Sequence, residues 1–267
     1  MENDPANEPV EEAVEVRCYF VRERNALLVR ASFTPAYTDY YLHLMEHKIR
    51  YNPEQDQTLK DALAVLALHL ASRPWNEAIA WTLSWQEPLQ NLFVTGSNRD
   101  GKITGRLFTE DIRKRDKDLL FAQVSVEGQE SRQSMIELIS NDMFEVGENY
   151  YEQSEQRLGR FFSYLEEDFV LITAQPDCDE EWLAGLDDEA IRNLDENETL
   201  SLLETRSYRF ECGCSQDKIF PILVGMTGET IDSIFDGQEV IPTSCPRCGA
   251  KYAITREALE AFAEENA

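Results

Sequence analysis

The sequence predicts an α+β protein in three parts: a large N-terminal domain of mixed antiparallel strands and inserted helices, an acidic helical linker, and a small C-terminal module. Three observations predict this order. Strand-like and helix-like patterns are interspersed up to residue 175. Acidic residues then dominate residues 176–207, and two closely spaced cysteine pairs follow within residues 208–267.

Composition and charge already exclude several classes of partner. The chain has 267 residues, with 51 acidic against 25 basic side chains and a net charge of −26. A cationic surface is needed to bind nucleic acid or an anionic membrane, so we expect neither as a partner. No apolar run approaches the roughly 18 residues of a membrane span, and residues 1–5 lack the basic start of a signal peptide. We therefore expect a cytoplasmic protein with reduced thiols.

The first residues predict a disordered tail followed by a β-hairpin. Residues 1–15 carry six acids, two prolines and no Lys or Arg, a composition typical of disorder. Apolar and polar residues then alternate from Val16 to Phe33 around a turn at Arg24 and Asn25.

Two helices and several strands are expected next. Thr38 is expected to cap a helix that runs to about His47, and Asp56 or Thr58 to open another through Leu70. Alternation then predicts strands over the segments Ile79–Trp85, Leu92–Val94, Ile103–Phe108 and Leu119–Val126.

The large domain is completed by one more helical stretch and two strands. A helix is predicted within Ser134–Gln156, and strands near Arg160–Leu165 and Phe169–Ala174. We therefore place the large domain at residues 16–175.

The linker, residues 176–207, is predicted from a shift in composition. Between Pro176 and Thr205 there are eleven acids and one arginine. Its apolar side chains are spaced as on short helical faces: Trp182, Leu183, Leu186, Leu194, Leu200, Leu202 and Leu203. Because like charges repel, we expect these helices to be weakly held.

The C-terminal cysteines are arranged as metal ligands. Cys212 and Cys214 flank one residue, Cys245 and Cys248 flank two, and thirty residues separate the pairs. Each pair places two sulfurs on one tight turn, and the intervening loop lets the two turns close a tetrahedral zinc site. Buried free thiols or disulfides are the alternatives, and a reducing cytoplasm disfavours disulfides.

Four cysteines close a zinc site, so we expect a structural role for one zinc ion per chain. The ion would stabilise a module too small to fold alone. Thiolates are also oxidised readily, and oxidation would release the metal and unfold the module. The spacing alone leaves both a static zinc module and a redox switch open.

The sequence resembles the 33 kDa chaperonin, or heat shock protein 33, family over nearly its whole length. The resemblance rests on the two cysteine pairs with Gly249 and Tyr252, and on the preceding Phe210–Glu211. Further resemblance extends over these segments: Arg30–His47, Asn91–Gly105, Tyr150–Gln156, Gly228–Ile234 and Glu239–Ile241.

This resemblance implies a redox-regulated, ATP-independent chaperone that is inactive while zinc is bound. Oxidation would form the disulfides Cys212–Cys214 and Cys245–Cys248, destabilise the linker and expose apolar surface to unfolded client proteins. Family members dimerise when active, so a homodimer of the oxidised form is expected. For the client surface we consider the strand face Ile79–Trp85 and the apolar linker helices.

Two other functions remain open. One is a constitutive zinc-stabilised interaction module without redox switching. The other is a histidine-metal hydrolase, because His43, Glu46 and His47 match the pattern H-x-x-E-H, which places both histidines on one helix face. This motif is short and matches often by chance, so we expect no enzyme and no catalytic residues.

Two cysteines lie outside the paired set. Cys18 falls in a strand pattern and is expected to be a small core residue. Cys178 lies among acidic residues, which would raise the pKa of its thiol and make it a poor nucleophile.

Overall fold

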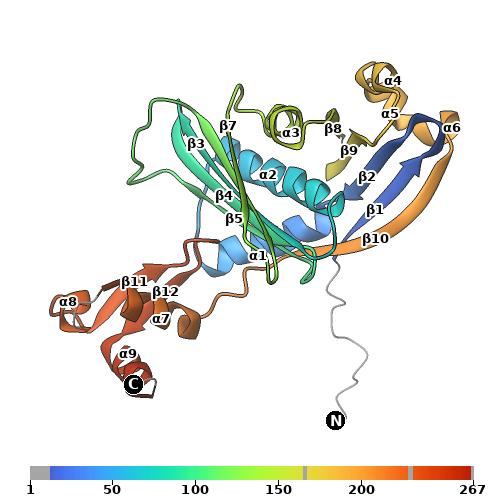
Figure 1. The fold of residues 1–267 in the computed structure, drawn as a ribbon. Coiled ribbons are helices and arrows are strands. Elements are labelled where there is room, and N and C mark those ends of the chain that lie inside the picture. The colour runs from blue at the N-terminus through green and yellow to red at the C-terminus, as the bar shows by residue number, and fades with distance from the viewer. Residues whose placement is uncertain (1–12, 165–166, 228–230, 266–267) are drawn as a thin grey trace, which may run out of the picture.

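The computed structural model describes residues 13–164, 167–227 and 231–265 (Figure 1). A large, strongly curved sheet with its helices occupies the first part of the chain, and a smaller module occupies the C-terminal part. Most of the predicted tail, residues 1–12, lies outside the described residues. Val14 and Glu15, also assigned to that tail, instead begin the first strand.

The described residues of the large part form one mixed sheet of ten strands in the order β7-β6-β3-β4-β5-β10-β1-β2-β9-β8. All neighbours are antiparallel except β5 and β10, which are parallel. The strands are β1 (Val14–Val21), β2 (Ala26–Ser32), β3 (Glu77–Gln86), β4 (Leu89–Ser97), β5 (Lys102–Phe108), β6 (Leu119–Val126), β7 (Arg132–Glu137), β8 (Gly159–Ser163), β9 (Asp168–Ala174) and β10 (Leu200–Phe210).

The predicted hairpin and the alternating strands are confirmed. β1 and β2 pair across a short 3₁₀ turn, η1 (Arg22–Arg24), and Asn25 takes the left-handed conformation with φ 50°. Asparagine tolerates this region better than most residues do, which explains why the turn falls there.

Helix α2 (Pro53–Ala71) forms the centre of the core. Its first turn carries a capping box, in which Asn52 accepts a hydrogen bond from the Gln55 amide and the Gln55 side chain accepts one from the Asn52 amide. The helix therefore begins before the predicted Asp56 or Thr58. Its C-terminal half is buried on every side, because the curved sheet and α3 (Met143–Tyr150) surround it.

Two other helix predictions need correction. Helix α1 (Thr34–Glu46) begins four residues before Thr38, because Pro35 suits a first helical turn. The predicted helix Ser134–Gln156 is partly wrong, since β7 occupies its start and pairs with β6. The rest of that stretch forms α3 and the π-helical turn η2 (Tyr151–Glu155).

The structure of residues 176–207, predicted as a helical linker, differs most from the prediction. Three short helices are present: α4 (Glu180–Ala184), α5 (Asp188–Arg192) and α6 (Leu194–Asn197). They pack onto the sheet rather than bridge two parts, because their buried apolar residues share one cluster with β2 and β9. Residues 200–207, expected as helix, belong to β10, which pairs with β1 along its length. Such long-range pairing overrides a weak local helical pattern.

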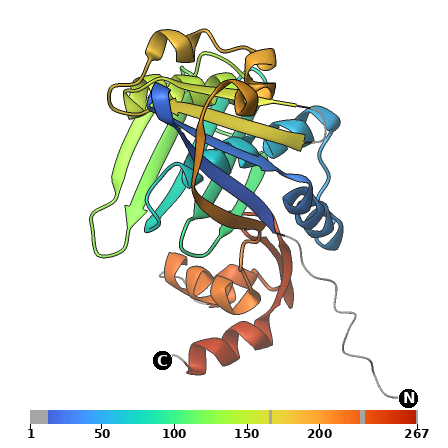
Figure 2. The ribbon, with the colours of Figure 1, turned by 90° about the vertical axis from the view of Figure 1, so that its right-hand side faces the viewer.

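The C-terminal module lies beyond the end of β10, to one side of the sheet (Figure 2). A small apolar cluster built on Phe220, Phe235, Ile254 and Leu259 forms its core. Its elements are α7 (Gln216–Thr227), α8 (Ile231–Phe235), β11 (Val240–Ser244), β12 (Lys251–Thr255) and α9 (Arg256–Glu265).

Candidate metal centre

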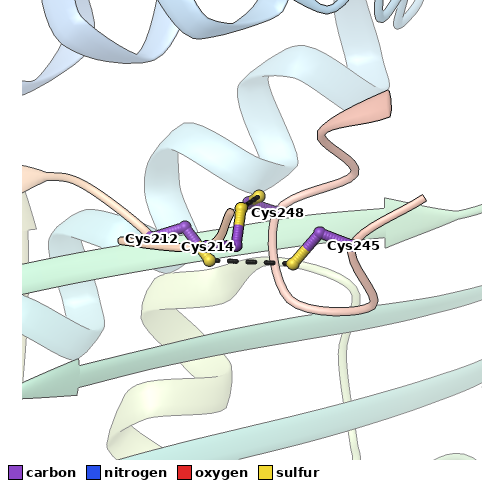
Figure 3. Close-up of side chains that lie close together, drawn as sticks. All are labelled: Cys212, Cys214, Cys245 and Cys248. Atoms are coloured by element: carbon purple, nitrogen blue, oxygen red, sulfur yellow. Dashed lines mark hydrogen bonds between the residues drawn. The ribbon is translucent and has the colours of Figure 1, made fainter. Parts of the chain in front are cut away.

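The structure brings the four predicted ligands together. Cys212 and Cys214 follow the end of β10, and Cys245 and Cys248 lie in the turn between β11 and β12 (Figure 3). Their four sulfur atoms all lie within 4.8 Å of one another. Among the residues that the structure describes, this is the one such group of potential metal ligands.

The sulfur geometry fits a tetrahedral zinc ion. A Zn–S bond of about 2.3 Å gives sulfur–sulfur edges of about 3.8 Å in a regular tetrahedron. The Cys212 and Cys245 sulfurs are 3.8 Å apart, and those of Cys214 and Cys248 are 3.5 Å apart. All four thiols are free, so the donor set is that of a structural zinc site.

Two glycines make the ligand turns possible. Gly213 has φ +62° and Gly249 has φ +77°, values in the left-handed region that residues with a Cβ atom adopt rarely. The turn after Cys245 is closed by a hydrogen bond from the Gly249 amide to the Cys245 carbonyl at 2.9 Å. A Cβ atom on Gly249 would also lie 3.2 Å from Ile49 of the large domain. The conformation of this turn is therefore constrained both by the cysteines that it carries and by Ile49 of the large domain.

Hydrogen bonds between the thiols concentrate negative charge at one sulfur. The thiols of Cys212 and Cys248 donate toward Cys245, which lowers the pKa of Cys245 well below its usual range. The hydrogen bond to Cys245 raises the pKa of Cys212 to about 12. The Tyr252 hydroxyl lies within hydrogen-bond distance of the Cys214 sulfur, at 3.1 Å. Burial is the main cause that raises the pKa of this tyrosine. Cys245 is therefore the sulfur most readily converted to a thiolate, and the Tyr252 hydroxyl offers a hydrogen bond to the Cys214 sulfur.

We call residues 245–251 the knuckle, and this segment is docked against the large domain. Arg106 on β5 donates to the Cys245 carbonyl at 3.0 Å. His43 on α1 donates its Nε2 proton to the Cys248 carbonyl at 3.0 Å, and the Lys251 amide donates to Nδ1 of His47 at 3.3 Å. Cys245 and Cys248 are thus joined to the sheet domain through their backbone carbonyls.

This docking explains the H-x-x-E-H motif without metal chemistry. His43 and His47 share one face of α1, with ring centroids 4.7 Å apart, as the spacing predicted. They contact the knuckle backbone, and neither belongs to the sulfur cluster. Burial lowers the pKa of His43, so a neutral imidazole donates to the Cys248 carbonyl. The sequence alone indicated neither this role nor that of Arg106, because nothing local in the sequence marks a contact across 139 residues.

The two remaining cysteines lie apart from the cluster. Cys18 is a core residue as predicted, with 1% of its surface exposed, and burial raises the pKa of its thiol to about 12. The pKa of Cys178 is also raised as predicted. The main cause is burial, and the neighbouring Glu180 and Asp179 carboxylates add to it.

The strand face considered for client binding is not on the surface. Ile79, Trp81, Leu83 and Trp85 are at most 1% exposed and pack in the central core. Alternation along β3 marked this face as apolar, but such a pattern identifies a buried face and not a binding surface. The Ile79–Trp85 face is therefore not available to clients in the form that the structure describes, and its use by the oxidised protein stays a prediction. The opposite face of the sheet carries exposed apolar residues instead, among them Phe121 and Met135.

The fold and the site together define a class of protein: a curved β-sheet domain joined to a small module that carries a cluster of four cysteines. The family model described as "Hsp33 protein" matches residues 163–255. Residues 163–255, which include all four cysteines of the cluster, are therefore similar to the Hsp33 proteins.

Curated relatives extend the match over most of the chain. The 33 kDa chaperonins of Mannheimia succiniciproducens and Aliivibrio salmonicida are each 24% identical, over 76% and 80% of this chain and 80% and 84% of theirs. The 33 kDa chaperonin of Caldanaerobacter subterraneus subsp. tengcongensis is 32% identical over 78 residues, which span 29% of this chain and 26% of that protein.

A solved structure shares the fold. The crystal structure of the 33 kDa chaperonin of Thermotoga maritima superposes with a TM-score of 0.71 at 11% sequence identity, covering 96% of this chain and 99% of that one. No described helix is long and apolar enough to cross a membrane.

Proposed function

We propose that this protein is a redox-regulated, ATP-independent holdase that binds unfolded proteins after oxidation of its metal centre. The observation that carries the proposal is the convergence of four free cysteine sulfurs within 4.8 Å. A regulated chaperone needs an apolar surface that stays covered until a signal exposes it. Oxidation of these thiols would supply that signal.

In the reduced protein, Cys212, Cys214, Cys245 and Cys248 would hold one zinc ion. When bound, zinc supplies cross-linking and stabilises all four sulfurs as thiolates. The chain's own contribution is the pair of glycine turns, the Tyr252 hydroxyl and the small apolar core of the module. Because that core is small, folding of residues 208–267 would depend on the ligands.

Oxidation would then convert the four thiols into two disulfides, Cys212–Cys214 and Cys245–Cys248, a pairing taken from the family resemblance. Each disulfide forms by loss of two electrons from two sulfurs, and one hydrogen peroxide takes them up to give two waters. The changed knuckle would lose its contacts with His43 and Arg106, and we expect the acidic segment 176–207 to loosen in turn.

Clients would bind exposed apolar side chains of the oxidised protein. Met135 is 66% exposed and lies directly opposite Phe121 on the neighbouring strand, and Leu202 and Leu203 on β10 are more than half exposed. The high negative charge would keep client complexes dispersed. We place this activity in the cytoplasm and expect the oxidised form to dimerise.

The test measures zinc, free thiols and chaperone activity on one sample before and after peroxide treatment with mild heat. We expect one zinc released and four thiols lost per chain, together with suppressed aggregation of a chemically denatured test protein. A Cys18→Ser/Cys178→Ser variant serves as control and should behave like the parent. If zinc and circular dichroism are unchanged by peroxide, the protein is instead a constitutive zinc-stabilised interaction module.

A further inference from the structure

The curved sheet of the large domain ends in two edge strands, β7 and β8 (Figure 1). An edge strand presents backbone donors and acceptors that no neighbouring strand has paired. Folded proteins usually cover such an edge, or interrupt it with charges, prolines or bulges. The two edges of this sheet differ in how they are covered.

The backbone of β7 alternates between groups that pair with β6 and groups that point outward. The Leu138 amide donates to the Asp118 carbonyl at 3.0 Å, and the register continues without a bulge along β7. In an antiparallel pair, alternate residues exchange both of their backbone hydrogen bonds with the partner strand. The even-numbered residues of β7 therefore bond to β6, and the amides and carbonyls of Gln133, Met135 and Glu137 point away from it.

One of these outward groups has a partner on helix α3. The Glu137 carbonyl accepts a hydrogen bond from the Asn149 side chain at 3.0 Å, which agrees with the alternation. The amides and carbonyls of Gln133 and Met135, by contrast, make no hydrogen bond with any residue that the structure describes. Helix α3 therefore covers the end of this edge and leaves its middle open.

The edge strand β8 is covered at its centre. The outward amide of Phe161 donates to the Glu148 carboxylate of α3 at 3.0 Å. The neighbouring Arg160 side chain donates to the Ala184 carbonyl at 2.9 Å and to the Leu186 carbonyl at 3.1 Å. This edge is thus held against two other segments of the chain.

The middle of β7 also lacks the features that usually protect an edge. The two charged residues of β7 lie at its ends, and both are paired: Arg132 with Glu77 at 2.7 Å, and Glu137 with Lys117 at 2.6 Å. Residues 133–136, between them, carry neither a charge nor a proline. Nothing in this stretch opposes pairing with a further strand.

The side chains beside the open edge indicate which strand it fits. Met135 and Phe121 lie directly opposite each other and are exposed on the face turned away from α2. An added strand would place every second side chain on this face, next to Met135. On the other face, the Ser134 hydroxyl is hydrogen-bonded to the Ser154 hydroxyl of η2 at 2.9 Å. The edge therefore suits an extended segment in which apolar and polar residues alternate.

We propose that the β7 edge binds an extended segment of an unfolded protein by strand addition, through the backbone of Gln133 and Met135. Unpaired backbone groups take an extended main chain as their complement, and an unfolded protein supplies one. A second copy of this chain fits less well, because residues 133–137 span only about 17 Å. Pairing over that length buries far less than the roughly 1,200 Å² of a stable dimer.

This inference rests on the proposed function for the identity of the partner, and it adds a contact that is open before oxidation. A single short edge gives a weak contact. Lasting capture of a client would still require the apolar surface that oxidation exposes.

The test uses reduced, zinc-loaded full-length protein and a short fluorescein-labelled peptide in which valine and threonine alternate. Fluorescence anisotropy should show saturable binding. The same peptide with methylated valine amides should bind about tenfold more weakly, because it keeps its side chains and loses the donors that face the edge. Amide exchange measured by NMR should slow at Gln133 and Met135 when the peptide is bound. Exchange at Ser134 and Ile136, which already bond to β6, should not change.

A matched pair of variants tests the same contact from the protein side. Gln133→Pro removes one outward amide and should weaken binding by about tenfold. Gln133→Ala loses the same side chain but keeps the amide, so it should bind within about twofold of the parent. Equal binding of the methylated and unmethylated peptides to the parent protein would overturn the proposal, whatever the stability of the proline variant.

Unchanged exchange at Gln133 and Met135 in the peptide complex would also overturn it. So would protection of these two amides by dimerisation without peptide, since the edge would then belong to a second copy. All of these measurements use the reduced protein. A failed holdase assay after peroxide treatment is therefore distinguishable from failure of strand addition.

Discussion

At the scale of single residues, the candidate metal centre includes a group that is not itself a predicted ligand. The Tyr252 hydroxyl lies 3.1 Å from the Cys214 sulfur, within reach of a hydrogen bond that favours the thiolate. Cys245 has such support from the backbone amides of Arg247 and Cys248. Cys214 should therefore be the ligand most sensitive to a change at residue 252.

Replacing this tyrosine should weaken the site without removing a ligand. We expect Tyr252→Phe to lower zinc affinity by about tenfold, because residues that hydrogen-bond to a metal ligand typically contribute at this level. Competition with a chromogenic chelator measures the change. Tyr41→Phe is the matched control, since its hydroxyl bonds to Asp56 on the large domain. Equal affinities in the parent and Tyr252→Phe proteins would show that the hydroxyl does not support the ligand.

A second residue gives the fold a pH dependence below neutrality. Burial raises the pKa of Asp61 on α2 from 3.8 to about 6. The protonated carboxyl is therefore favoured by folding, and its stabilisation is complete below pH 3.8 and is lost as the pH rises through about 6. Asp61→Asn should be more stable than the parent by about 1–2 kcal/mol at pH 7 and nearly equal to it at pH 3.5. Urea unfolding at both pH values measures this, and a pH-independent difference would contradict it.

At the scale of elements, α1 and β5 hold the knuckle in place. Their contacts reach the backbone of the two ligand-bearing residues Cys245 and Cys248, so the position of the metal centre is coupled to the sheet domain. The coupling uses one donor from a helix end and one from a strand. Removing both donors would leave two carbonyls without their partners.

The double variant His43→Ala/Arg106→Ala should undock the knuckle while zinc remains bound. Loss of both hydrogen bonds should destabilise the docked arrangement by about 2 kcal/mol. Hydrogen exchange of residues 245–251 should then increase, with no change in exchange of β3. Arg160→Ala is a matched control, because Arg160 also donates to backbone carbonyls but on the far part of the sheet. Unchanged exchange in the knuckle would show that docking depends on other contacts.

The properties of single helices and strands also explain which of them could be predicted from the sequence. Helix α2 and strands β3 to β6 follow from strong periodicity, because each buries one continuous set of side chains. β10 was missed because it pairs with β1, which is far away in the sequence. β7 was missed because its local alternation is weak, although it pairs with the neighbouring β6. The cysteine cluster was predicted because ligand spacing is local, whereas the docking contacts of His43 and Arg106 join residues far apart along the chain.

At the scale of the whole molecule, stability is unevenly distributed. The large domain has one extensive core around α2, whereas the C-terminal module has a core built on four fully or nearly buried apolar residues. A core of that size rarely stabilises a fold by itself. The metal centre and its docking to the sheet would therefore supply most of the module's stability.

Removal of the metal should unfold the module and leave the sheet domain intact. We expect a strong chelator under reducing conditions to abolish hydrogen-exchange protection in β11 and β12, whose hairpin carries two of the ligands between its strands. Protection in β3 and α2 should persist, because their side chains are buried without help from the module. Re-addition of zinc should restore protection in β11 and β12, whereas magnesium, which prefers oxygen ligands, should not. Global loss of protection would contradict an independent large core, and unchanged protection in the hairpin would show that the module folds without its metal.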